Sequence, residues 1–596
     1  MEQNDQRNMM LAIVLMVVLM FGYSTFVLEP QARQERAARA RAVAEQVQAA
    51  AVQAPKIERQ RDEVVAEGLS SAARVKVEGP AIDGSILLKG ARIDDISLKG
   101  FYETIDDKLS DRREGEIQLL SPDQTARPFF AEMYWKSPTG VTTREAVWTQ
   151  TSTGPLTPDN PLDLQLSLQA GRIDRRVTVD DNYLFTISDT FTNTSAETIS
   201  ITPETFVRQK MLPDLLKIAR EDQQAHKGVL GAYGPKKNQM VKYTDLNKGK
   251  GVVEEVSTGW IALTTKYWMA AAIPDQREAV TMRAMVEKAN GDTVFEAGFT
   301  GAARSIAPGA SATASSRIFA GAKRVSVLEA YQKTAGIPDF TDAVDWSWLW
   351  FITKPFFWML QTFQNWFGSF GLAILAVTVV VKTAFFPVQM KVYESMSKLR
   401  KLQPEMEEIR KRFEADRARQ QQEVMKLYQR EKANPLAGCL PLIPQAFVFY
   451  ALYHTLMVSL EMRHTPFYGW IKDMSAPDPT TIFNLFGLLP WDPAALPLIG
   501  SFLMIGVWPL LYGLTMWALQ GMSAPPTDPT QKMIMQFLPL IFLILFAGFA
   551  AGLVIYWVWS NAITMVQQYV IMRRNGVETE FDKLLKRLLN RKAGAS

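Results

Sequence analysis

Six long apolar stretches interrupt the polar segments of this chain of 596 residues. The first lies near the N-terminus, and the other five all follow residue 345. The six runs are Met9–Leu28, Phe370–Pro387, Leu436–Leu460, Ile499–Leu519, Met533–Ala551 and Leu553–Met572. A helix needs about 20 mostly apolar residues to cross a bilayer. The pattern therefore predicts six transmembrane helices, the last two forming a tight hairpin around Gly552.

The first run has two interpretations, a cleaved signal peptide or a permanent anchor. Its apolar core is longer than the roughly 7–15 residues of a typical signal peptide, and no A-x-A cleavage site follows it. We therefore interpret residues 1–28 as an uncleaved transmembrane anchor.

Lys and Arg predict how the spans are oriented, because these residues concentrate in cytoplasmic loops. Lys391–Lys432 contains twelve Lys/Arg against eight Asp/Glu, and Arg573–Ser596 contains seven against three. Glu461–Gly500 contains only two against four. We expect both termini in the cytoplasm and residues 29–344 outside. Four arginines between residues 33 and 41 disagree, but the pattern of the five later spans outweighs this single flank.

The long segment that we expect outside the membrane changes in amino-acid composition along its length. Residues 29–69 are rich in Ala, Gln, Arg and Glu and are typical of a linker. From 70 to 340, short β-branched runs such as Arg176–Val179 and Tyr183–Thr192 alternate with turn residues. This pattern predicts a large antiparallel β-sandwich. The segment contains no cysteine, so its core must be large enough to stabilise it without a disulfide.

Two further helical elements flank the apolar runs. Residues 344–367 are amphipathic and Trp-rich, which favours a helix lying in the membrane interface; a seventh span is the alternative. Residues 389–432 carry an apolar stripe at helical spacing and a fresh helix start at Pro404, which predicts a cytoplasmic helical hairpin. The alternative is that this charged pair of helices is only a solvated structural element without a binding function.

These elements together define the expected fold class. It is a multi-pass α-helical membrane protein with six spans, of which five form a helical core at 368–572 that includes the hairpin. A large β-sandwich domain stands outside the membrane, and a basic tail at 573–596 ends the chain.

Composition and motifs exclude several classes of function. The net charge is only +4, which is too small for a protein that coats nucleic acid. One cysteine and three scattered histidines give no confident metal site. No Walker A or H-E-x-x-H motif occurs, and no Asp or Glu lies within a predicted span. We expect a protein that is not an enzyme and that binds no cofactor or metal.

Lys382 is the informative polar residue within the predicted spans. A lysine inside a span costs about 2.5–3.5 kcal/mol on insertion scales, so it normally faces a cavity or a partner. The alternative is snorkelling toward the cytoplasm, which would require the helix to run on for some turns to reach the charged Lys391 region.

Other polar groups accompany Lys382 in the predicted spans. Thr378 lies one turn earlier, Gln445 lies mid-span, and the last span carries a polar face. That face consists of Ser560, Asn561, Thr564, Gln567 and Gln568. Such a stripe either joins helices or lines a watery cavity. Because the spans supply no carboxylate for the lysine, we expect water to solvate it and infer a hydrated groove open to the cytoplasm.

Several ordered motifs resemble the YidC family of bacterial membrane protein insertases (YidC/Oxa/Alb, of the Gram-negative type with a large periplasmic domain). They are KLQPEMEEIRKRF, LYQREKANPLAGCLPLIPQ, APPTDPTQKMIMQFLPLIF and FAAGLVIYWVWSNAITMVQQ, and the similarity is strong over about residues 340–575. The resemblance implies a five-helix insertase core around a hydrophilic groove and a periplasmic β-supersandwich. It also implies insertion, folding and assembly of proteins in the inner membrane, independently of Sec or with it.

The resemblance also implies partners and site residues. The partners are nascent membrane proteins, the Sec translocon with its accessory subunits, the lipid bilayer, and the ribosome, which would dock on the cytoplasmic hairpin and tail. Lys382 matches the groove's positive residue, Thr378, Tyr556 and Trp557 match substrate-contacting positions, and Gln445 matches a groove-lining position. The positive residue is typically Arg in the family and is Lys here, which places the permanence of its charge in question. Ser560, Asn561 and Thr564 complete the predicted groove.

Three alternatives compete with this interpretation. A secondary transporter with a midplane site is one, but no repeat of spans is visible. The β-domain as a sugar-binding module is another, and it rests on fold analogy alone. For the tail, anchoring on anionic lipid competes with binding ribosomal RNA, because both attract a basic helix.

Overall fold

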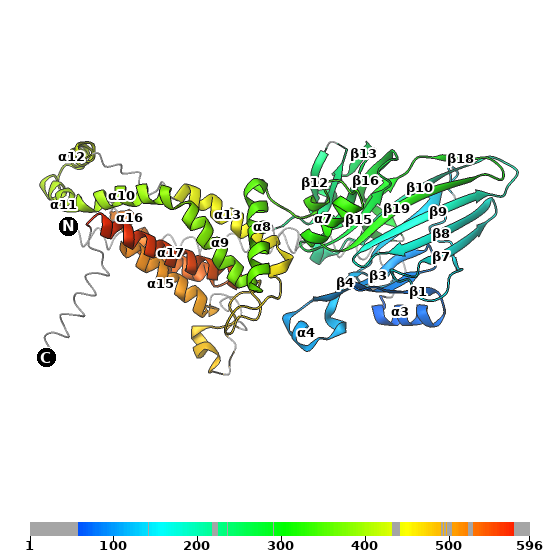
Figure 1. Cartoon of the computed structure of the whole chain (residues 1–596), viewed down its shortest axis with the longest axis horizontal. Coiled ribbons are helices and arrows are strands. Elements are labelled where there is room, and N and C mark those ends of the chain that lie inside the picture. The colour runs from blue at the N-terminus through cyan, green and yellow to red at the C-terminus, as the bar shows by residue number, and fades with distance from the viewer. Residues whose placement is uncertain are drawn as a thin grey trace, which may run out of the picture.

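The computed structural model describes residues 58–140, 142–216, 225–234, 236–289, 291–431, 442–489, 491, 493, 496, 503–522 and 529–576. The predicted anchor, most of the predicted linker and nearly all of the basic tail lie outside these residues. Figure 1 shows two parts along the long axis of the molecule, with β-sheets at one end and helices at the other.

Two antiparallel sheets, of ten and nine strands in the described residues, form the β-domain. The first contains β1 (Arg74–Glu78), β2 (Ile82–Leu87), β3 (Arg92–Tyr102), β4 (Glu116–Leu120), β5 (Phe129–Lys136), β10 (Ile199–Lys210), β13 (Val252–Val256), β16 (Val280–Ala289), β17 (Asp292–Thr300) and β18 (Arg304–Ile306). The second contains β6 (Thr149–Gln150), β7 (Leu162–Leu168), β8 (Gly171–Val179), β9 (Leu184–Asn193), β11 (Gly228–Tyr233), β12 (Lys236–Lys242), β14 (Gly259–Thr264), β15 (Trp268–Pro274) and β19 (Ser311–Ala322). The central order of the first is β3-β5-β10-β17-β16, and that of the second is β14-β15-β19-β9-β8. The predicted large β-sandwich is confirmed.

Alternation of side chains explains how these strands form a core. Along β8 every second residue is buried, and its pairing with β9 sets Ile173 against Phe191 and Val177 against Ile187. Because successive side chains point to opposite faces of a strand, this period of two places one face inside. Short helices accompany the sheets: α3 (Arg61–Ser70), α4 (Ile105–Ser110), η2 (Arg113–Gly115), α6 (Tyr243–Leu246), α7 (Val325–Thr334) and η3 (Phe340–Ala343).

A charged pair lies inside this sandwich. Arg175 and Asp189 are fully buried, and the guanidinium donates to both carboxylate oxygens at 2.7 and 2.8 Å. Trp135 donates a further hydrogen bond to Asp189 at 2.8 Å, and the guanidinium lies 4.3 Å from the Trp148 ring centre. A buried ion needs such hydrogen bonds to offset the loss of hydration, although the Nη1 of Arg175 has no hydrogen-bond partner among the described residues.

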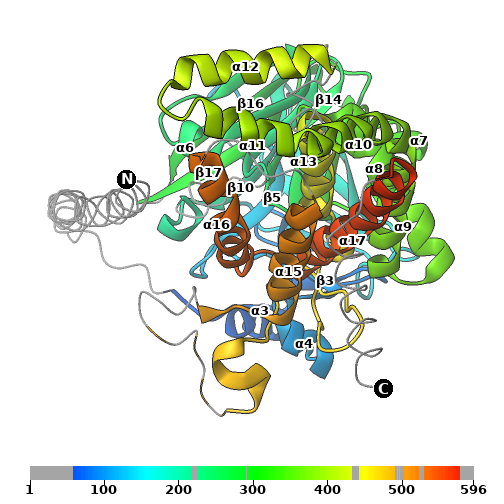
Figure 2. The ribbon, with the colours of Figure 1, turned by 90° about the vertical axis from the view of Figure 1, so that its left-hand side faces the viewer.

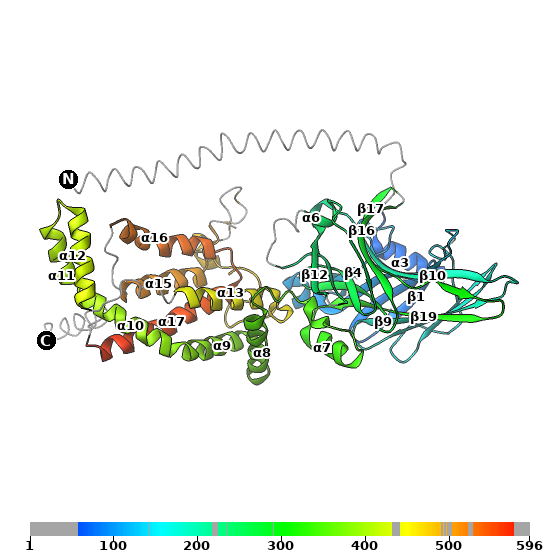
Figure 3. The ribbon, with the colours of Figure 1, turned by 90° about the horizontal axis from the view of Figure 1, so that it is seen from above.

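The helical part contains α8 (Trp350–Phe367), α9 (Phe370–Ala384), α10 (Phe386–Lys401), α11 (Gln403–Arg412), α12 (Arg417–Arg430), α13 (Leu442–Val458), α15 (Val507–Met522), α16 (Pro529–Phe546) and α17 (Ala551–Arg574), with the short turns η5 (Leu460–Met462) and η6 (Ile482–Gly487). Figure 3 shows α11 and α12 at the end remote from the β-sheets. They pack through Leu402, Met406 and Leu427.

Only a bent pair of helices satisfies the length and hydropathy expected of a membrane crossing in the described part of the chain. This pair is Phe370–Ala384 with Phe386–Glu394, bent by 58° at Phe385, and no single helix qualifies. Shorter apolar helices occur at Ala446–Val458 and Met533–Phe546. The count of six spans therefore stays a prediction.

Helix α8 runs across the direction of α9 and α17 in Figure 1. Its Phe356, Phe357 and Leu360 are buried, whereas Trp358 and Trp366 are exposed. The helix thus has a packed face and an exposed aromatic face, and its place in the membrane interface stays a prediction.

Polar contacts join the β-domain to the helices. Asp345, which precedes α8, accepts a hydrogen bond from the backbone N–H of His226 at 3.0 Å, and its own carbonyl accepts one from His454 Nε2 at 2.6 Å. A second contact is made by Arg463, which donates to the Tyr102 carbonyl at 2.7 Å. The two parts are therefore linked on both sides of α8 in the sequence.

His226 gives this junction a pH dependence that can be measured. Burial lowers the pKa of its imidazole to about 4, although a 2.7 Å hydrogen bond from Nε2 to the Val229 carbonyl opposes the shift. In the unfolded chain the pKa is about 6.5. Between pH 6.5 and 4 the unfolded chain binds the extra proton more readily, so stability falls as the pH falls through this window.

We predict that hydrogen-exchange protection of β11 in the full-length protein falls between pH 6.5 and 4. The shift of this pKa from 6.5 to about 4 corresponds to a loss of up to about 3 kcal/mol in the free energy of unfolding, because one pKa unit is worth about 1.36 kcal/mol. The His226→Gln variant cannot take up this proton and is expected to lose less protection over the same range. Equal losses of protection in the two proteins would show that His226 is not the source of this pH dependence.

Candidate functional site

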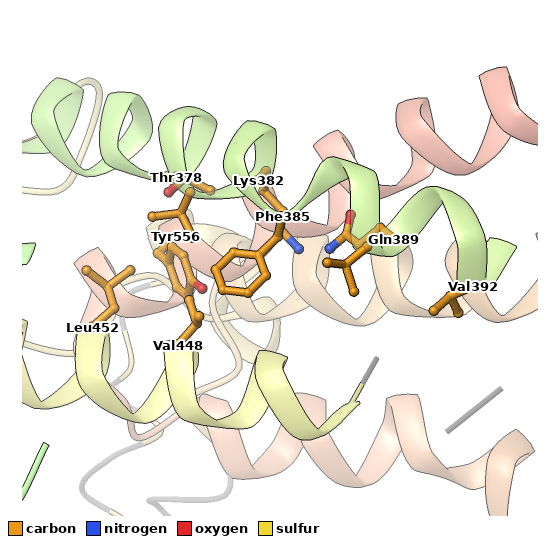
Figure 4. Close-up of a pocket in the computed structure, with 10 residues that line it drawn as sticks. Thr378, Lys382, Phe385, Gln389, Val392, Val448, Leu452 and Tyr556 are labelled. Atoms are coloured by element: carbon orange, nitrogen blue, oxygen red, sulfur yellow. The ribbon is translucent and has the colours of Figure 1, made fainter. Parts of the chain in front are cut away.

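A pocket opens between α9, α10, α13 and α17, and Figure 4 shows the side chains that surround it. It encloses about 540 Å³ of space, open solvent at its mouth included. Its lining consists of Thr378, Val381, Lys382, Phe385, Val388, Gln389, Val392, Val448, Leu452 and Tyr556. Most of these side chains are apolar, and one of the ten is charged. The pocket therefore combines a surface fit for an apolar segment with a localised positive charge.

Lys382 lies in the last turn of α9 and is 6% exposed. Its Nζ donates to Thr564 Oγ1 on α17 at 3.0 Å, and the same hydroxyl donates to the Ser560 carbonyl at 2.8 Å. A second link runs between these helices, because Gln567 Nε2 donates to the Lys382 carbonyl at 3.3 Å. The predicted association of Lys382 with the polar face of the last helix is thus present as direct hydrogen bonds.

Thr378 and Tyr556 both line the pocket near Lys382 (Figure 4), and each is nearly fully buried. The Thr378 hydroxyl donates to the Ile374 carbonyl of its own helix at 2.7 Å. This local bond satisfies the hydroxyl donor where water is scarce. Thr378 on α9 and Tyr556 on α17 thus contribute one polar and one amphipathic side chain to the lining of the pocket.

Trp557 faces away from this pocket, although it follows Tyr556 directly. Its ring centre lies 3.8 Å from that of Phe546 and 4.8 Å from that of Phe449, in stacked geometry, and 5.8 Å from that of Tyr512. Successive helical residues point about 100° apart, because 3.6 residues complete a turn. The structure therefore places Tyr556 at the pocket and Trp557 in an aromatic cluster that packs α13, α15 and α16 around α17.

The polar face of α17 also divides between two neighbours. Thr564 contacts Lys382, and Ser560 supplies the carbonyl that accepts from the Thr564 hydroxyl. Asn561 Nδ2 instead donates to Thr515 Oγ1 on α15 at 3.2 Å. Gln568 likewise donates to the Met522 carbonyl of α15 at 3.1 Å. One part of the stripe thus joins helices, and the other lies beside the pocket lysine. The backbone of Gln445 lies in the first turn of α13, which begins at Leu442, but its side chain is outside the described residues.

Gln389 lines the pocket and is absent from the residues predicted from the sequence. Its Oε1 is buried and has no hydrogen-bond partner among the residues that the structure describes. The sequence places residue 389 at the start of the cytoplasmic hairpin, but the 58° bend returns α10 to the pocket. Pro387 indicates a helix break at this point in the sequence, because proline disfavours a helix interior and suits the first turn of a new helix.

No group of three or more His, Cys, Asp or Glu in the described part of the chain is arranged to hold a metal ion. The arrangement can accept an apolar segment against Phe385, Val448 and Leu452 while a cation stands beside it.

Comparison with known proteins gives full-length matches. The family described as 60Kd inner membrane protein matches residues 362–578, and the YidC periplasmic domain matches residues 74–359. The membrane protein insertase YidC of Maricaulis maris is 43% identical over 99% of both chains. That of Caulobacter vibrioides is 42% identical over the whole of both chains. A crystal structure described as active YidC insertase shares 14% identity, covers 83% of this chain and 92% of its own, and has a TM-score of 0.35, which is too low to add to the argument.

The two family matches together span most of the chain, and the curated relatives align with it from end to end. They divide it as the structure does, into a β-domain and a helical part. This chain therefore belongs to the YidC family of membrane protein insertases, inner membrane proteins that carry a periplasmic domain.

Proposed function

We propose that this chain inserts membrane proteins by receiving their apolar segments in the pocket between α9, α10, α13 and α17. The observation that carries the proposal is the position of Lys382, a buried cation beside a largely apolar pocket. Its relatives are named membrane protein insertases, and the family is non-enzymatic, so the substrate leaves chemically unchanged.

The substrate itself supplies the driving force for this process. Each Leu, Ile, Phe or Val that moves to the middle of a bilayer contributes about −0.3 to −0.6 kcal/mol. The barrier is the polar flank, since a charged residue at that depth costs about 2.5–3.5 kcal/mol. A polar, water-admitting groove that reaches partway across the membrane shortens the apolar path that this flank has to cross.

Lys382 and its neighbours provide that polarity in the proposed groove. The ammonium group, the Thr378 and Thr564 hydroxyls and the buried Gln389 amide form a polar strip along one wall. Tyr556, Phe385 and Val448 offer an opposing surface for an apolar helix. Because α10 leads from the pocket to the hairpin α11–α12, the groove opens toward the cytoplasm in this proposal, and Lys382 attracts acidic flanks.

The proposed topology follows the distribution of charge. Six spans place both termini in the cytoplasm and residues 29–344 in the periplasm, with α8 lying in the outer interface. The proposed boundaries are those of the anchor (1–28), linker (29–69), β-sandwich (70–340), interfacial helix (344–367), core (368–572) and tail (573–596). The exposed tryptophans of α8 support its interfacial place.

Nascent chains reach the groove from the ribosome in this proposal, alone or through the Sec translocon. The hairpin offers a basic surface for ribosomal RNA, with Lys411, Arg412 and Arg419 exposed. The hairpin is internally braced by a 2.6 Å ion pair between Arg430 and Glu405 and by its apolar contacts. The hairpin projects from the bundle and is therefore accessible to a ribosome in this proposal.

Substitution of Lys382 tests the proposed role of the charge. In cells depleted of the native protein, Lys382→Arg is expected to support insertion of a small membrane protein, whereas Lys382→Ala is expected to reduce it partially. Partial loss is expected because Thr378, Thr564 and Gln389 still admit water. Lys382→Glu is expected to impair substrates with acidic flanks more than neutral ones. The measurement is protease protection of the inserted substrate, with expression checked by blotting.

The matched control is Lys391→Ala, which removes an exposed lysine from α10. Insertion at the unsubstituted level with Lys382→Ala, at equal expression, would refute the proposed role of the charge, because snorkelling alone predicts that the more apolar span is tolerated.

Charge reversal on the hairpin tests the ribosome contact. Lys411→Glu with Arg412→Glu is expected to weaken co-sedimentation with ribosomes and to reduce the salt dependence of binding by about one unit of log–log slope per lost phosphate contact. Lys76→Glu, which reverses an exposed lysine of the β-domain, is the control. Removing Lys583–Ser596 is expected to weaken the same co-sedimentation. Unchanged binding in both hairpin and tail variants would eliminate ribosomal RNA as their partner.

A further inference from the structure

An apolar loop between α13 and α15 stands out from the helical part. It consists of Ile482–Leu489, which includes η6, together with Trp491. Six large apolar side chains of this loop are at least 40% exposed. They are Phe483, Leu485, Phe486, Leu488, Leu489 and Trp491, and Leu488 reaches 83%. Water is an unfavourable surrounding for so dense a group of apolar side chains.

A set of hydrogen bonds holds the base of the apolar loop in place. Asp478 is 2% exposed, and its carboxylate accepts from the N–H groups of Thr480 at 3.0 Å and Trp508 at 2.9 Å. A Cβ added at Gly506 would lie 2.5 Å from the Asp478 side chain, so the backbone packs closely there. The loop is therefore clamped to the beginning of α15.

The backbone of the apolar loop turns its side chains outward. Leu485 and Phe486 have φ values of 51° and 59°, in the left-handed region that non-glycine residues rarely adopt. Thr481 accepts a hydrogen bond from the Phe483 N–H at 3.2 Å and fixes the entry to the turn. Two consecutive residues in this conformation cost free energy, and the turn still presents both apolar side chains to the surroundings.

The charge pattern distinguishes the apolar loop from a surface that faces water. Between Pro479 and Thr527 the sequence contains one charged residue, Asp492, whereas charged residues make up 21% of the whole chain. Phe, Leu and Trp are side chains favoured at the boundary between headgroups and acyl chains.

The position of the apolar loop agrees with a place at that boundary. In Figure 1 the gold turn of η6 stands out sideways from the bundle, near the end that faces the β-domain. Figure 2, seen from the hairpin end, shows it at the edge of the molecule beyond α15 and away from α8. On α15, which follows in the sequence, Leu514 and Trp517 are also 58% and 66% exposed.

We propose that the apolar loop is a lipid-binding element that inserts into the outer leaflet of the inner membrane at the headgroup boundary. The inference rests on the proposed topology, which places Glu461–Gly500 on the periplasmic side. With α8 on the other side of the bundle, the loop gives the periplasmic end two lateral supports. These two supports resist tilting of the helices while a substrate moves through the pocket.

Site-specific fluorescence tests this proposal in the full-length protein. In a Cys439→Ala background, which removes the single native cysteine, Leu488→Cys is labelled with the environment-sensitive dye NBD after reconstitution into phosphatidylethanolamine–phosphatidylglycerol vesicles. We expect bromolipids brominated near the headgroup to quench this dye and aqueous iodide to quench it poorly. Reaction of Leu488→Cys with an impermeant maleimide is expected to be about tenfold slower than at an aqueous site, the order of magnitude for burying one leucine.

Two matched sites calibrate the measurement. Val253→Cys, at a 64% exposed valine of β13, reports water, and Leu514→Cys on α15 reports lipid. Iodide quenching at residue 488 equal to that at 253 would overturn the proposal, and so would shielding from both quenchers, which would indicate that protein covers the loop. The quenching does not depend on insertion activity, so it separates failure of this inference from failure of the proposed function.

Discussion

A cation held between two helices in apolar surroundings is the constraint on which the rest of the site depends. Lys382 cannot lose its hydration without replacement contacts, because an ion is far less stable in a medium of low dielectric constant. Thr564 on α17 provides one such contact at 3.0 Å, and the bend at Phe385 places Gln389 at the same pocket. The pairing of α9 with α17 and the break between α9 and α10 therefore bring polar groups to the place where this charge lies.

The remaining helices hold this arrangement in position. Trp557 fills the space between α13, α15 and α16 with stacked aromatic rings, and Asn561 and Gln568 join α17 to α15. One wall of the pocket is therefore α17, which is fixed on its far side and contributes the buried, amphipathic ring of Tyr556 to the lining. On the periplasmic side, Asp345 and Arg463 connect the bundle to a sandwich whose own core contains the bidentate Arg175–Asp189 pair.

Local periodicity made much of this architecture predictable. The β-sandwich follows from strands with a period of two, and the hairpin follows from the apolar stripe that places Leu402 and Met406 in one small core. The polar face of the last span could be found from the spacing of Ser560 and Thr564. The resemblance in motifs then added Tyr556 and the family, and the full-length relatives support that assignment.

The contacts between helices could not be predicted from the periodicity of the sequence. The polar stripe of α17 faces two different helices, and its division between Lys382 and Thr515 depends on how α9 and α15 pack against it. Trp557 is equally suited by type to a substrate surface or a core, and only the neighbouring Phe546 and Phe449 place it in the core. Gln389 lines the pocket because of the 58° bend between α9 and α10. Pro387 indicates that the helix breaks near this point, but a proline in the sequence predicts neither the angle nor the direction of a bend.

The central claim is that a substrate's apolar segment occupies the pocket during insertion, and site-specific photocrosslinking tests it most directly. A photoreactive residue is introduced at Tyr556 or at Val566, which lies on the same helix but is 64% exposed away from the pocket. Ribosome-bound chains stalled with their apolar segment just emerged provide the substrate. The account predicts strong crosslinks to that segment from position 556 and weak ones from 566. Crosslinks from 566 that equal or exceed those from 556 would contradict it.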